Sequence, residues 1–404
     1  MTLSRTRRLR WTGAVTAATT AAVLSAITSP VSAAPSEGPT GHILGAGKPG
    51  SVSNSYIVTL KGGTKAPSEA GKDLAAKYGA KIRHTYSTAL NGYAVKAGSV
   101  DAKRLAADPK VASVVQDSKV SLRHTQKNPP SWGLDRIDQN DLPLDKSYTW
   151  PESAGAGVTA YVIDTGIRTT HHDFGGRAHS GWDFVDNDAT AQDGNGHGTH
   201  VAGTVAGESY GVAKKADVVG VRVLDDAGSG TTAQVIAGID WVTKHAKKPA
   251  VANLSLGGYA NAQLDAAVRN SIASGVTYTV AAGNDGLPAE LYSPARVKEA
   301  VTVGATDQKD ARASFSNWGG RLDLFAPGVA ITSASNASDT AKETFSGTSM
   351  ASPHVAGAAA LYLADHPSAP PAEVAKALVE RAVPGKVTGG GPGSPNRILQ
   401  VNNP

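Results

Sequence analysis

Apolar runs and helix-like periods alternate along the chain from Trp132 onward. Runs typical of buried strands occupy residues 158–164, 218–224, 251–256, 276–282 and 300–304. Apolar residues recur at helical spacing in 232–245, 264–273, 354–363 and 372–379. Because strand and helix patterns follow one another repeatedly, we expect an α/β fold with a doubly wound, mostly parallel sheet. In such folds the chemistry lies at the carboxyl ends of the strands.

A shorter set of patterns precedes this region, in residues 55–123. Strand-like runs occupy 55–60, 91–95 and 111–116, and helix-like periods occupy 66–78 and 100–107. This β-α-β-α-β order in so short a segment predicts a small ferredoxin-like α+β domain. A core of this size is only marginally stable by itself.

Residues 1–33 have the pattern of a secretory signal peptide. Basic residues come first, an Ala/Val/Leu/Ile-rich stretch follows from Trp11, and small residues surround an expected cut after Ala33. A membrane anchor is the weaker interpretation because Thr and Ser dilute the apolar stretch. Arg7-Arg8 leaves the export route open between general secretion and the twin-arginine pathway. We therefore expect a secreted, extracellular protein.

Two polar segments separate these parts of the chain. Residues 35–54 are rich in Pro, Gly and Ser and predict a flexible linker. Residues 124–131 contain two prolines and predict a second junction.

Composition narrows the possible functions. The 404 residues are 40% hydrophobic and 18% charged, which is enough apolar material for a sizeable core. The net charge of +5 is mild and lies partly in the first ten residues, so we expect no nucleic-acid partner. No stretch after the first 33 residues is apolar enough to predict a membrane span. The absence of cysteine excludes disulfides, thiolate catalysis and Cys-ligated zinc.

One serine stands at the predicted start of an apolar helix. Ser349 lies in Gly-Thr-Ser-Met-Ala-Ser-Pro-His (347–354), immediately before the helical period. Taken alone, this segment favours a helix cap, in which the hydroxyl accepts a backbone N–H bond. The alternative is a nucleophile, with the positive end of the helix dipole close by.

Three further polar residues stand at predicted strand ends or helix starts. Asp164 follows a strand-like run, and Asn284 follows the run that ends at 282. His197 lies between glycines in Gly-His-Gly-Thr-His-Val-Ala-Gly (196–203). A cap remains open for Asp164 and a turn for Asn284. His197 and His200 could also ligate a metal, although no Glu lies between them as in zinc hydrolase helices.

Together these residues form the set that serine chemistry requires: a nucleophile, a base, a carboxylate and an amide donor. Val-Ile-Asp-Thr-Gly-Ile, Gly-His-Gly-Thr-His-Val-Ala-Gly and Gly-Thr-Ser-Met-Ala-Ser-Pro-His, in this order, resemble the subtilase family from Trp132 to about Leu399. Residues 132–139 and 394–397 are similar to its proteinase K and aqualysin branch. Residues 55–123 resemble the inhibitor-type propeptide of that branch.

The resemblance implies a role for each candidate residue. Ser349 would attack the scissile carbonyl, and His197 would act as base and then as acid. Asp164 would orient His197, and Asn284 would form the oxyanion hole with the Ser349 backbone N–H. Residues 34–124 would be a propeptide, acting as intramolecular chaperone and inhibitor, and 125–404 the peptidase. Cleavage between His124 and Thr125 is favoured.

Two segments resemble the edges of a substrate cleft. One edge contains Gly228, Ser229 and Gly230, and the other contains Ser255, Leu256 and Gly257. A peptide held between them would be recognised by main-chain hydrogen bonds, which implies broad specificity. Leu256 with Ala281, Ala282 and Gly283 would line the first pocket, roomy and uncharged, which implies apolar or aromatic residues before the cut. Ordinary Gly-rich loops are the alternative.

Calcium is implied by the same resemblance. One site would use the carbonyls of Lys298 and Ala300 with the carboxylate of Asp323. A second would use Asp135, Asp138, Gln139 and Asp145, and a weaker third Asp183 with Asp188. Clustered oxygen ligands suit Ca²⁺, although each set could also be an ordinary solvated acidic turn.

Two disulfide positions of this branch carry other residues here, namely Gly194 with Asp226 and Glu290 with Arg321. The second pair suggests an ion pair, and a surface ion pair is worth about 0–1 kcal/mol against about 2–4 for a disulfide. We therefore expect greater dependence on calcium than in bridged relatives.

The favoured function is a secreted, self-processing, monomeric serine endopeptidase acting on proteins and peptides. A non-catalytic binder that inhibits other proteases is a second hypothesis. A metal-dependent hydrolase that uses His197 and His200 is a third.

Overall fold

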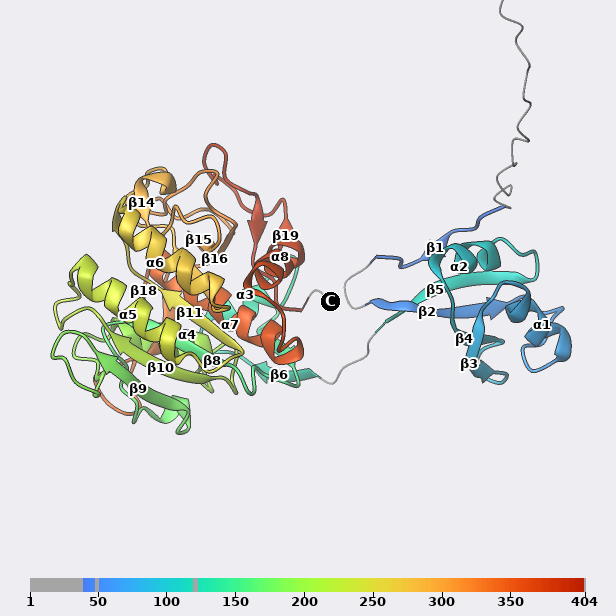
Figure 1. Cartoon of the computed structure of the whole chain (residues 1–404), viewed down its shortest axis with the longest axis horizontal. Coiled ribbons are helices and arrows are strands. Elements are labelled where there is room, and N and C mark those ends of the chain that lie inside the picture. Colours follow the sequence, from blue (N-terminus) through green and yellow to red (C-terminus); the bar gives the residue numbers. More distant parts are fainter. Residues whose placement is uncertain (1–38, 48–50, 119–122, 403–404) are drawn as a thin grey trace, which may run out of the picture. The chain divides into compact units, whose positions relative to one another are not determined.

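The computed structural model describes residues 39–47, 51–118 and 123–402, in two compact units (Figure 1). The smaller unit contains Asn54–Val115 with the described residues up to Leu44, and the larger contains the described chain from Gln116 onward. The predicted signal peptide, residues 1–33, lies outside the described residues. Within those residues, no helix is long and apolar enough to cross a membrane.

The smaller unit is a five-stranded sheet with two helices. Its strands lie in the order β1-β5-β2-β4-β3. The elements are β1 (Ile43–Leu44), β2 (Ser51–Leu60), α1 (Glu69–Lys77), β3 (Lys81–Tyr86), β4 (Gly92–Lys96), α2 (Ser99–Ala106) and β5 (Val111–Ser118). From β2 onward the order is β-α-β-β-α-β, which confirms the ferredoxin-like prediction.

Two details of the sequence prediction for this unit are wrong. Strand β3 was missed because its side chains are mostly exposed and polar, so its sequence has no apolar period. The flexible linker predicted for 35–54 is wrong for Ile43–Leu44, which pair with Val114 and Val115 of β5, and for the start of β2 at Ser51. Strand pairing with distant residues, which composition does not reveal, orders these segments.

The larger unit is built on a nine-stranded sheet in the order β19-β20-β16-β15-β13-β11-β8-β10-β9. Its pairs are parallel except β19 with β20 at one edge, which confirms the doubly wound, mostly parallel prediction. The strands are β8 (Thr159–Asp164), β9 (Ala178–Asp183), β10 (Asp217–Arg222), β11 (Ala250–Leu254), β13 (Thr277–Ala281), β15 (Val301–Thr306), β16 (Leu324–Pro327), β19 (Val383–Pro384) and β20 (Arg397–Ile398).

Helices cover both faces of this sheet. Along β8, Ala160 and Val162 join the core that contains α4 (His197–Ala206), α7 (Thr348–Asp365) and α8 (Pro371–Arg381). The alternate residues Tyr161 and Ile163 join the core under α5 (Thr232–His245) and α6 (Ala262–Ala273) (Figure 1). This two-residue alternation places one apolar side chain on each face, as the continuous apolar runs of buried parallel strands require.

Helix α7 is the central helix of the larger unit. It packs against β11, β13 and β15, and its residues from Thr348 to Leu363 are buried. Small residues make this packing possible: a Cβ on Gly357 would lie 2.5 Å from the Cβ of Val212. The start of α7 lies close to the carboxyl ends of β11 and β13, because Ser349 bonds to Ser255 and Thr348 bonds to Gly283.

Shorter elements complete the larger unit. They are β6 (Arg123–Lys127), α3 (Trp132–Ile137), β7 (Ser147–Pro151), the 3-10 helices η1 (His172–Phe174) and η2 (Ala289–Leu291), β12 (Gly258–Tyr259), β14 (Tyr292–Ser293), β17 (Ile331–Ala334) and β18 (Lys342–Phe345). Strand β6 corrects the junction predicted for 124–131. His124 and Thr125, on either side of the favoured cut, pair with Trp150 and Thr149 of β7 in the uncut chain.

Candidate active site

A buried carboxylate is hydrogen-bonded to Nδ1 of the His197 imidazole. Asp164, the last residue of β8, is fully buried, and its Oδ1 lies 2.7 Å from His197 Nδ1. The same oxygen accepts the Thr165 N–H at 2.8 Å. Burial alone would lower the pKa of His197, but the charge and hydrogen bond of Asp164 outweigh it and raise the pKa above the ordinary value. The carboxylate therefore stabilises the protonated ring and leaves Nε2 free.

Glycines bring His197 to this carboxylate. Gly196 has φ of 110°, a left-handed conformation that favours glycine, and starts α4. A Cβ on Gly198 would lie 2.1 Å from the Gly166 carbonyl, so only glycine lets α4 approach the end of β8 so closely. This close approach explains the Gly-His-Gly pattern.

Asp193 was missed by the sequence analysis. Its buried carboxylate accepts the Thr165 hydroxyl at 2.9 Å and the Gly196 N–H at 2.8 Å. Its other oxygen accepts the Thr199 N–H at 2.9 Å and hydroxyl at 2.5 Å. These bonds fasten the first turn of α4 to the residue after Asp164. The signal in the sequence is an acidic residue just before a predicted helix, a pattern that ordinary helix caps share.

Ser349 lies in the first turn of α7. The cap of this helix is Gly347, which makes no side-chain cap bond, so the capping alternative for Ser349 is wrong. The Ser349 hydroxyl donates to the Ser255 carbonyl at 3.0 Å, and the Ser255 hydroxyl donates to the Ser349 carbonyl at 2.7 Å. Within the described chain, the hydroxyl makes no hydrogen bond to His197.

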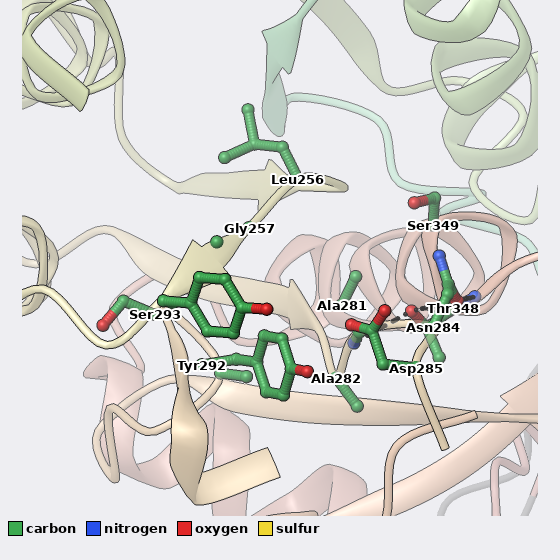
Figure 2. A pocket seen from close by; sticks show the side chains of 14 residues that line it. Leu256, Gly257, Ala281, Ala282, Asn284, Asp285, Tyr292, Ser293, Thr348 and Ser349 are labelled. Carbon is green, nitrogen blue, oxygen red and sulfur yellow. Dashed lines mark hydrogen bonds between the residues drawn. The ribbon is translucent and has the colours of Figure 1, made fainter. Parts of the chain in front are cut away.

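The Asn284 amide is turned by its neighbour Thr348. Both the N–H and the hydroxyl of Thr348 donate to Asn284 Oδ1, at 2.8 and 2.9 Å (Figure 2). Because both partners are donors, the carbonyl end must face Thr348 and the NH₂ end is left free. Thr348 is itself fully buried and accepts the Gly283 N–H at 3.1 Å. Sequence analysis missed this role of Thr348.

The arrangement contradicts the metal alternative. His200 is buried, contacts the Ile331 carbonyl through Nε2 at 2.9 Å and packs against the Phe345 ring. Burial lowers the pKa of His200 to about 4. His200 is thus a core residue whose Nε2 is occupied by a backbone carbonyl, and among the described residues it belongs to no group that could hold a metal ion.

A pocket of about 320 Å³ opens beside Ser349. Figure 2 shows its lining, which contains the predicted Leu256, Ala281 and Ala282. The predicted Gly283 also lines the pocket. The lining also contains residues that we did not predict, namely Tyr259, Asp285, Tyr292, Ser293 and Ala295 with their neighbours.

The expectation of an uncharged pocket is wrong, because the Asp285 carboxylate is part of the lining (Figure 2). Burial and this neighbouring carboxylate raise the pKa of the Tyr292 hydroxyl. Tyr292 stacks on Tyr259 through the pairing of β12 with β14, with ring centroids 5.8 Å apart. The pocket therefore combines aromatic faces with one negative charge.

The sequence model of the Subtilase family matches residues 155–399, and that of the Peptidase inhibitor I9 family matches residues 55–123. The chain belongs to the subtilase family. A crystal structure of a cold adapted subtilisin-like serine proteinase is similar to it with a TM-score of 0.65 and 55% identity, covering 67% of this chain and 97% of that one.

Two relatives of this subtilase are proteases by name. The extracellular serine proteinase of Thermus sp. (strain Rt41A) is 55% identical over 321 residues, which are 80% of this chain and 78% of the relative. The alkaline serine exoprotease A of Vibrio alginolyticus is 50% identical over 331 residues, 81% of this chain and 61% of the relative. This subtilase is therefore a serine protease with an inhibitor I9 domain at its N-terminal side.

The first predicted substrate edge of the subtilase is a tight loop. The Ser229 carbonyl accepts the Asp225 N–H at 2.8 Å, and the Ser229 N–H donates to Asp225 Oδ1 at 2.9 Å. Both main-chain groups of Ser229 are thus used within the loop, and the Gly228 N–H donates to the Asp225 carbonyl at 2.9 Å. The Gly228 carbonyl and the main-chain groups of Gly230 are left as candidates for a peptide. On the opposite edge, the Ser255 carbonyl is occupied by the Ser349 hydroxyl.

The first predicted calcium site of the subtilase fits a cation. Asp323 lies beside the start of β15, where its Oδ2 accepts the Thr302 N–H at 2.8 Å, and Lys298 and Ala300 directly precede this strand. Burial raises the pKa of Asp323 to about 6. A carboxylate whose charge is so poorly solvated favours a nearby cation.

The second predicted site fits in part. Burial, with repulsion from Asp145 and Asp135, raises the pKa of Asp138 to about 7, and Asp138 Oδ1 is buried without a partner in the described region. Gln139 Oε1, however, already accepts the Asp145 N–H at 3.0 Å. Among residues 39–47, 51–118 and 123–402, no three acidic or histidine side chains gather in a metal-binding group.

The third candidate site stays a prediction, and the predicted ion pair is wrong. The backbones of Asp183 and Asp188 pair with each other, while the Asp183 side chain pairs with Arg222 at 2.6 Å. Among the ion pairs of the described chain, none joins Glu290 to Arg321, and the Glu290 carboxylate lies against Gly319. Gly194 and Asp226 do lie together: a Cβ on Gly194 would be 2.4 Å from Asp226 Cγ.

Proposed function

We propose that this subtilase is a secreted, self-processing, monomeric endopeptidase that forms an acyl-enzyme through Ser349. The observation that carries the proposal is the buried Asp164–His197 bond at the end of β8, with Ser349 bonded to Ser255 just past the end of the neighbouring strand β11. In this role Asp164 fixes the imidazole with Nδ1 inward and stabilises the imidazolium. Secretion is supported by the word extracellular in the name of the Thermus relative.

The first step requires a change of Ser349 rotamer. Its hydroxyl must leave the Ser255 carbonyl and donate to His197 Nε2, which takes the proton as Oγ attacks the scissile carbonyl. His197 then gives this proton to the leaving amine, and the acyl group stays on Ser349. Water, deprotonated by His197, attacks this acyl-enzyme and releases the peptide acid and the Ser349 hydroxyl. Hydrogen bonds of this kind are often formed only in the substrate complex.

We propose that Asn284 Nδ2 and the Ser349 backbone N–H bind the developing oxyanion. Support comes from the orientation of the amide, whose carbonyl end is held by Thr348. The N–H of Ser349 belongs to the first turn of α7, where backbone donors have no helical partner. Removing the amide should cost roughly 10²–10³ in kcat.

We propose that the pocket takes apolar and aromatic residues before the cut and also accepts Lys and Arg. Tyr259, Tyr292 and Leu256 supply apolar and aromatic surface, and Asp285 supplies a charge for a long cationic side chain. Gly228, Ser229 and Gly230 on one side, with Ser255, Leu256 and Gly257 on the other, would hold the peptide main chain.

We propose that the I9 domain assists folding, inhibits the peptidase and is removed near His124–Thr125. Strand β6 would have to leave β7 for this bond to reach Ser349. We also propose that Ca²⁺ stabilises the peptidase at Lys298, Ala300 and Asp323, and at the cluster around Asp138, where oxygen donors of the right chemistry lie.

The decisive experiment compares the full chain with Ser349→Ala. We expect the wild type to process itself and to bind a fluorophosphonate at Ser349, and the variant to do neither, with kcat reduced on the order of 10⁶. Processing of both forms to the same product, in the absence of another protease, would contradict the proposal. Inhibition by a zinc chelator without phosphonate labelling would instead favour a metal hydrolase.

A further inference from the structure

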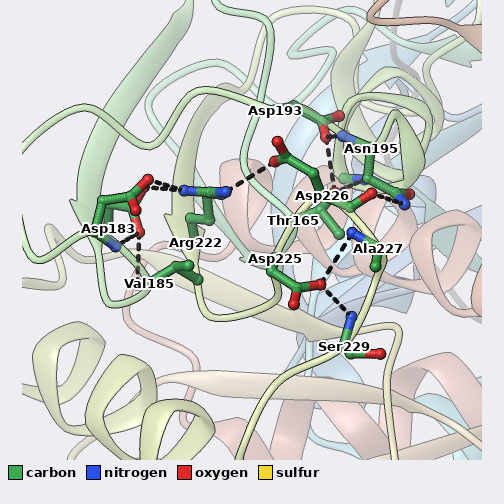
Figure 3. A network of polar contacts seen from close by, with 12 residues as sticks. Thr165, Asp183, Val185, Asp193, Asn195, Arg222, Asp225, Asp226, Ala227 and Ser229 are labelled. Carbon is green, nitrogen blue, oxygen red and sulfur yellow. Dashed lines mark hydrogen bonds and ion pairs between the residues drawn. The ribbon is translucent and has the colours of Figure 1, made fainter.

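One arginine gathers three carboxylates beside the active site. Arg222 ends β10 and is buried, and its Nη1 lies 2.6 Å from Asp183 (Figure 3). The same nitrogen lies 2.7 Å from Asp186. Its Nη2 lies 2.8 Å from Asp226. Burial lowers the pKa of Arg222, but the bonds to Asp183 and Asp186 outweigh it, so the guanidinium stays charged.

Asp226 begins the loop that carries Gly228, Ser229 and Gly230. The loop is rigid within itself, because Asp225 Oδ1 accepts the N–H groups of Ala227 and Ser229 at 3.0 and 2.9 Å (Figure 3). These internal bonds do not determine where the loop lies relative to the sheet. The Arg222–Asp226 pair joins the loop to β10.

A second bond joins the same loop to His197. Asn195 Nδ2 donates to the Asp226 carbonyl at 2.9 Å, and Asn195 Oδ1 accepts the His197 N–H at 3.2 Å. One side-chain amide thus bridges the loop and the first residue of α4. Figure 3 shows Asn195 and Arg222 on either side of Asp226.

We propose that Arg222 is a positioning residue that sets the distance between the peptide-binding loop and His197. It acts through Asp226 and Asn195 and touches neither substrate nor the reacting atoms. This inference rests on the proposed function, because a loop that binds peptide and a histidine that acts as base are assumed. The three acidic partners exceed the single positive charge of Arg222, so loss of the arginine would leave Asp183 buried and unpaired and Asp226 repelled from the sheet.

The geometry predicts which substrates respond. A peptide with several residues before the cut needs the loop, whereas a single-residue ester needs only the pocket and the catalytic atoms. A loop displaced from His197 therefore raises KM for the long peptide and leaves hydrolysis of the ester unchanged. A merely structural loss of folded enzyme would lower both rates in the same proportion.

The test uses the mature form of Asp226→Asn and of Arg222→Lys, each titrated by fluorophosphonate labelling of Ser349. For Asp226→Asn we expect KM for a six-residue peptide to rise five- to tenfold, with kcat and ester hydrolysis unchanged. Arg222→Lys, which keeps the charge but cannot reach three carboxylates in a fork, should give an intermediate rise. Equal loss of peptide and ester activity, or no change in either, would overturn the proposal.

A disulfide gives a second arm that does not depend on the acidic cluster. Because Asp226 Cγ lies 2.4 Å from a Cβ on Gly194, and a C–C bond is about 1.5 Å, the two Cβ atoms would be at most about 3.9 Å apart, compatible with a disulfide. The chain has no other cysteine, so Gly194→Cys/Asp226→Cys adds a single bridge.

In the Arg222→Lys background, we expect this bridge to restore the wild-type KM for the six-residue peptide and a reductant to abolish the effect. If the oxidised bridge leaves KM raised, loop position is not what Arg222 controls. Failure of the proposed function would look different, because the wild type itself would then not be labelled at Ser349.

Discussion

Thr348→Val should separate orientation of the Asn284 amide from its presence. Valine keeps the shape of the fully buried threonine but removes the hydroxyl that donates to Asn284 Oδ1 at 2.9 Å and accepts the Gly283 N–H at 3.1 Å. The Thr348 N–H still holds Asn284 Oδ1 at 2.8 Å, so one of two orienting bonds remains.

The expected cost follows from these bonds. One lost hydrogen bond is worth about 0.5–1.5 kcal/mol, and a buried N–H left without a partner costs about 1–3 kcal/mol. We therefore expect unfolding free energy to fall by about 1–3 kcal/mol. If about 1–2 kcal/mol of oxyanion stabilisation is lost with the amide's orientation, kcat falls roughly 5- to 30-fold, less than the roughly 10²–10³ expected for Asn284→Leu. KM should not change.

The assay is a double-mutant cycle on active enzyme titrated by fluorophosphonate. Thr348→Val should reduce kcat in the wild type but have little effect in the Asn284→Leu background, because both changes act on one donor. Thr348→Ser, which keeps the hydroxyl, is the matched control and should retain kcat. If Thr348→Val lowers kcat by the same factor with and without Asn284, the hydroxyl does not act through the amide.

Three further predictions follow from the charges of the site. In a profile of kcat/KM against pH, the midpoint of the acidic limb should lie above the ordinary histidine pKa, because Asp164 raises the pKa of His197 and the base must be neutral. Asp164→Asn should shift this midpoint to lower pH and should also lower kcat. Asp285→Asn should lower kcat/KM about 5- to 10-fold for peptides with Lys before the cut, which corresponds to about 1–1.4 kcal/mol for a partly solvated ion pair. The kcat/KM for the same peptides with Phe before the cut should not change. Because burial raises the pKa of Asp138 to about 7, ionisation of Asp138 destabilises the calcium-free fold as pH rises from about 4 to 7. At pH 8, a chelator should therefore accelerate thermal inactivation of the wild type more than that of Asp138→Asn. An equal acceleration in the two proteins would exclude this calcium site.

Much of the fold could be predicted because local sequence periods carry it. The period over 232–245 matches α5 residue for residue, and the apolar runs locate β8, β11, β13 and β15 to within two residues. Buried parallel strands expose neither face, so their sequences are continuous apolar runs that stand out from helices. Strand β3 has exposed, polar side chains and lacks this signal.

The sequence by itself also determined which residues are candidates for the chemistry. Asp164, His197, Asn284 and Ser349 stand at element ends in one order, and His197 lies between two glycines. What only the tertiary structure decided are contacts between residues distant in sequence. Thr348 meets Asn284 across 64 residues, and the Asp285 carboxylate reaches the pocket that Tyr259 and Tyr292 close.

Charged residues show the limit most clearly. Glu290 and Arg321 were expected to pair, yet Asp226 pairs with Arg222 and Asp183 is taken by the same arginine. An apolar period involves residues that are close in sequence, because a helix or strand needs apolar side chains at regular positions to bury a face. The partner of a charged side chain depends on distance and burial, which are set only when the strands have assembled. In the sequence, a carboxylate that binds calcium therefore cannot be distinguished from one in an ion pair or in a solvated turn.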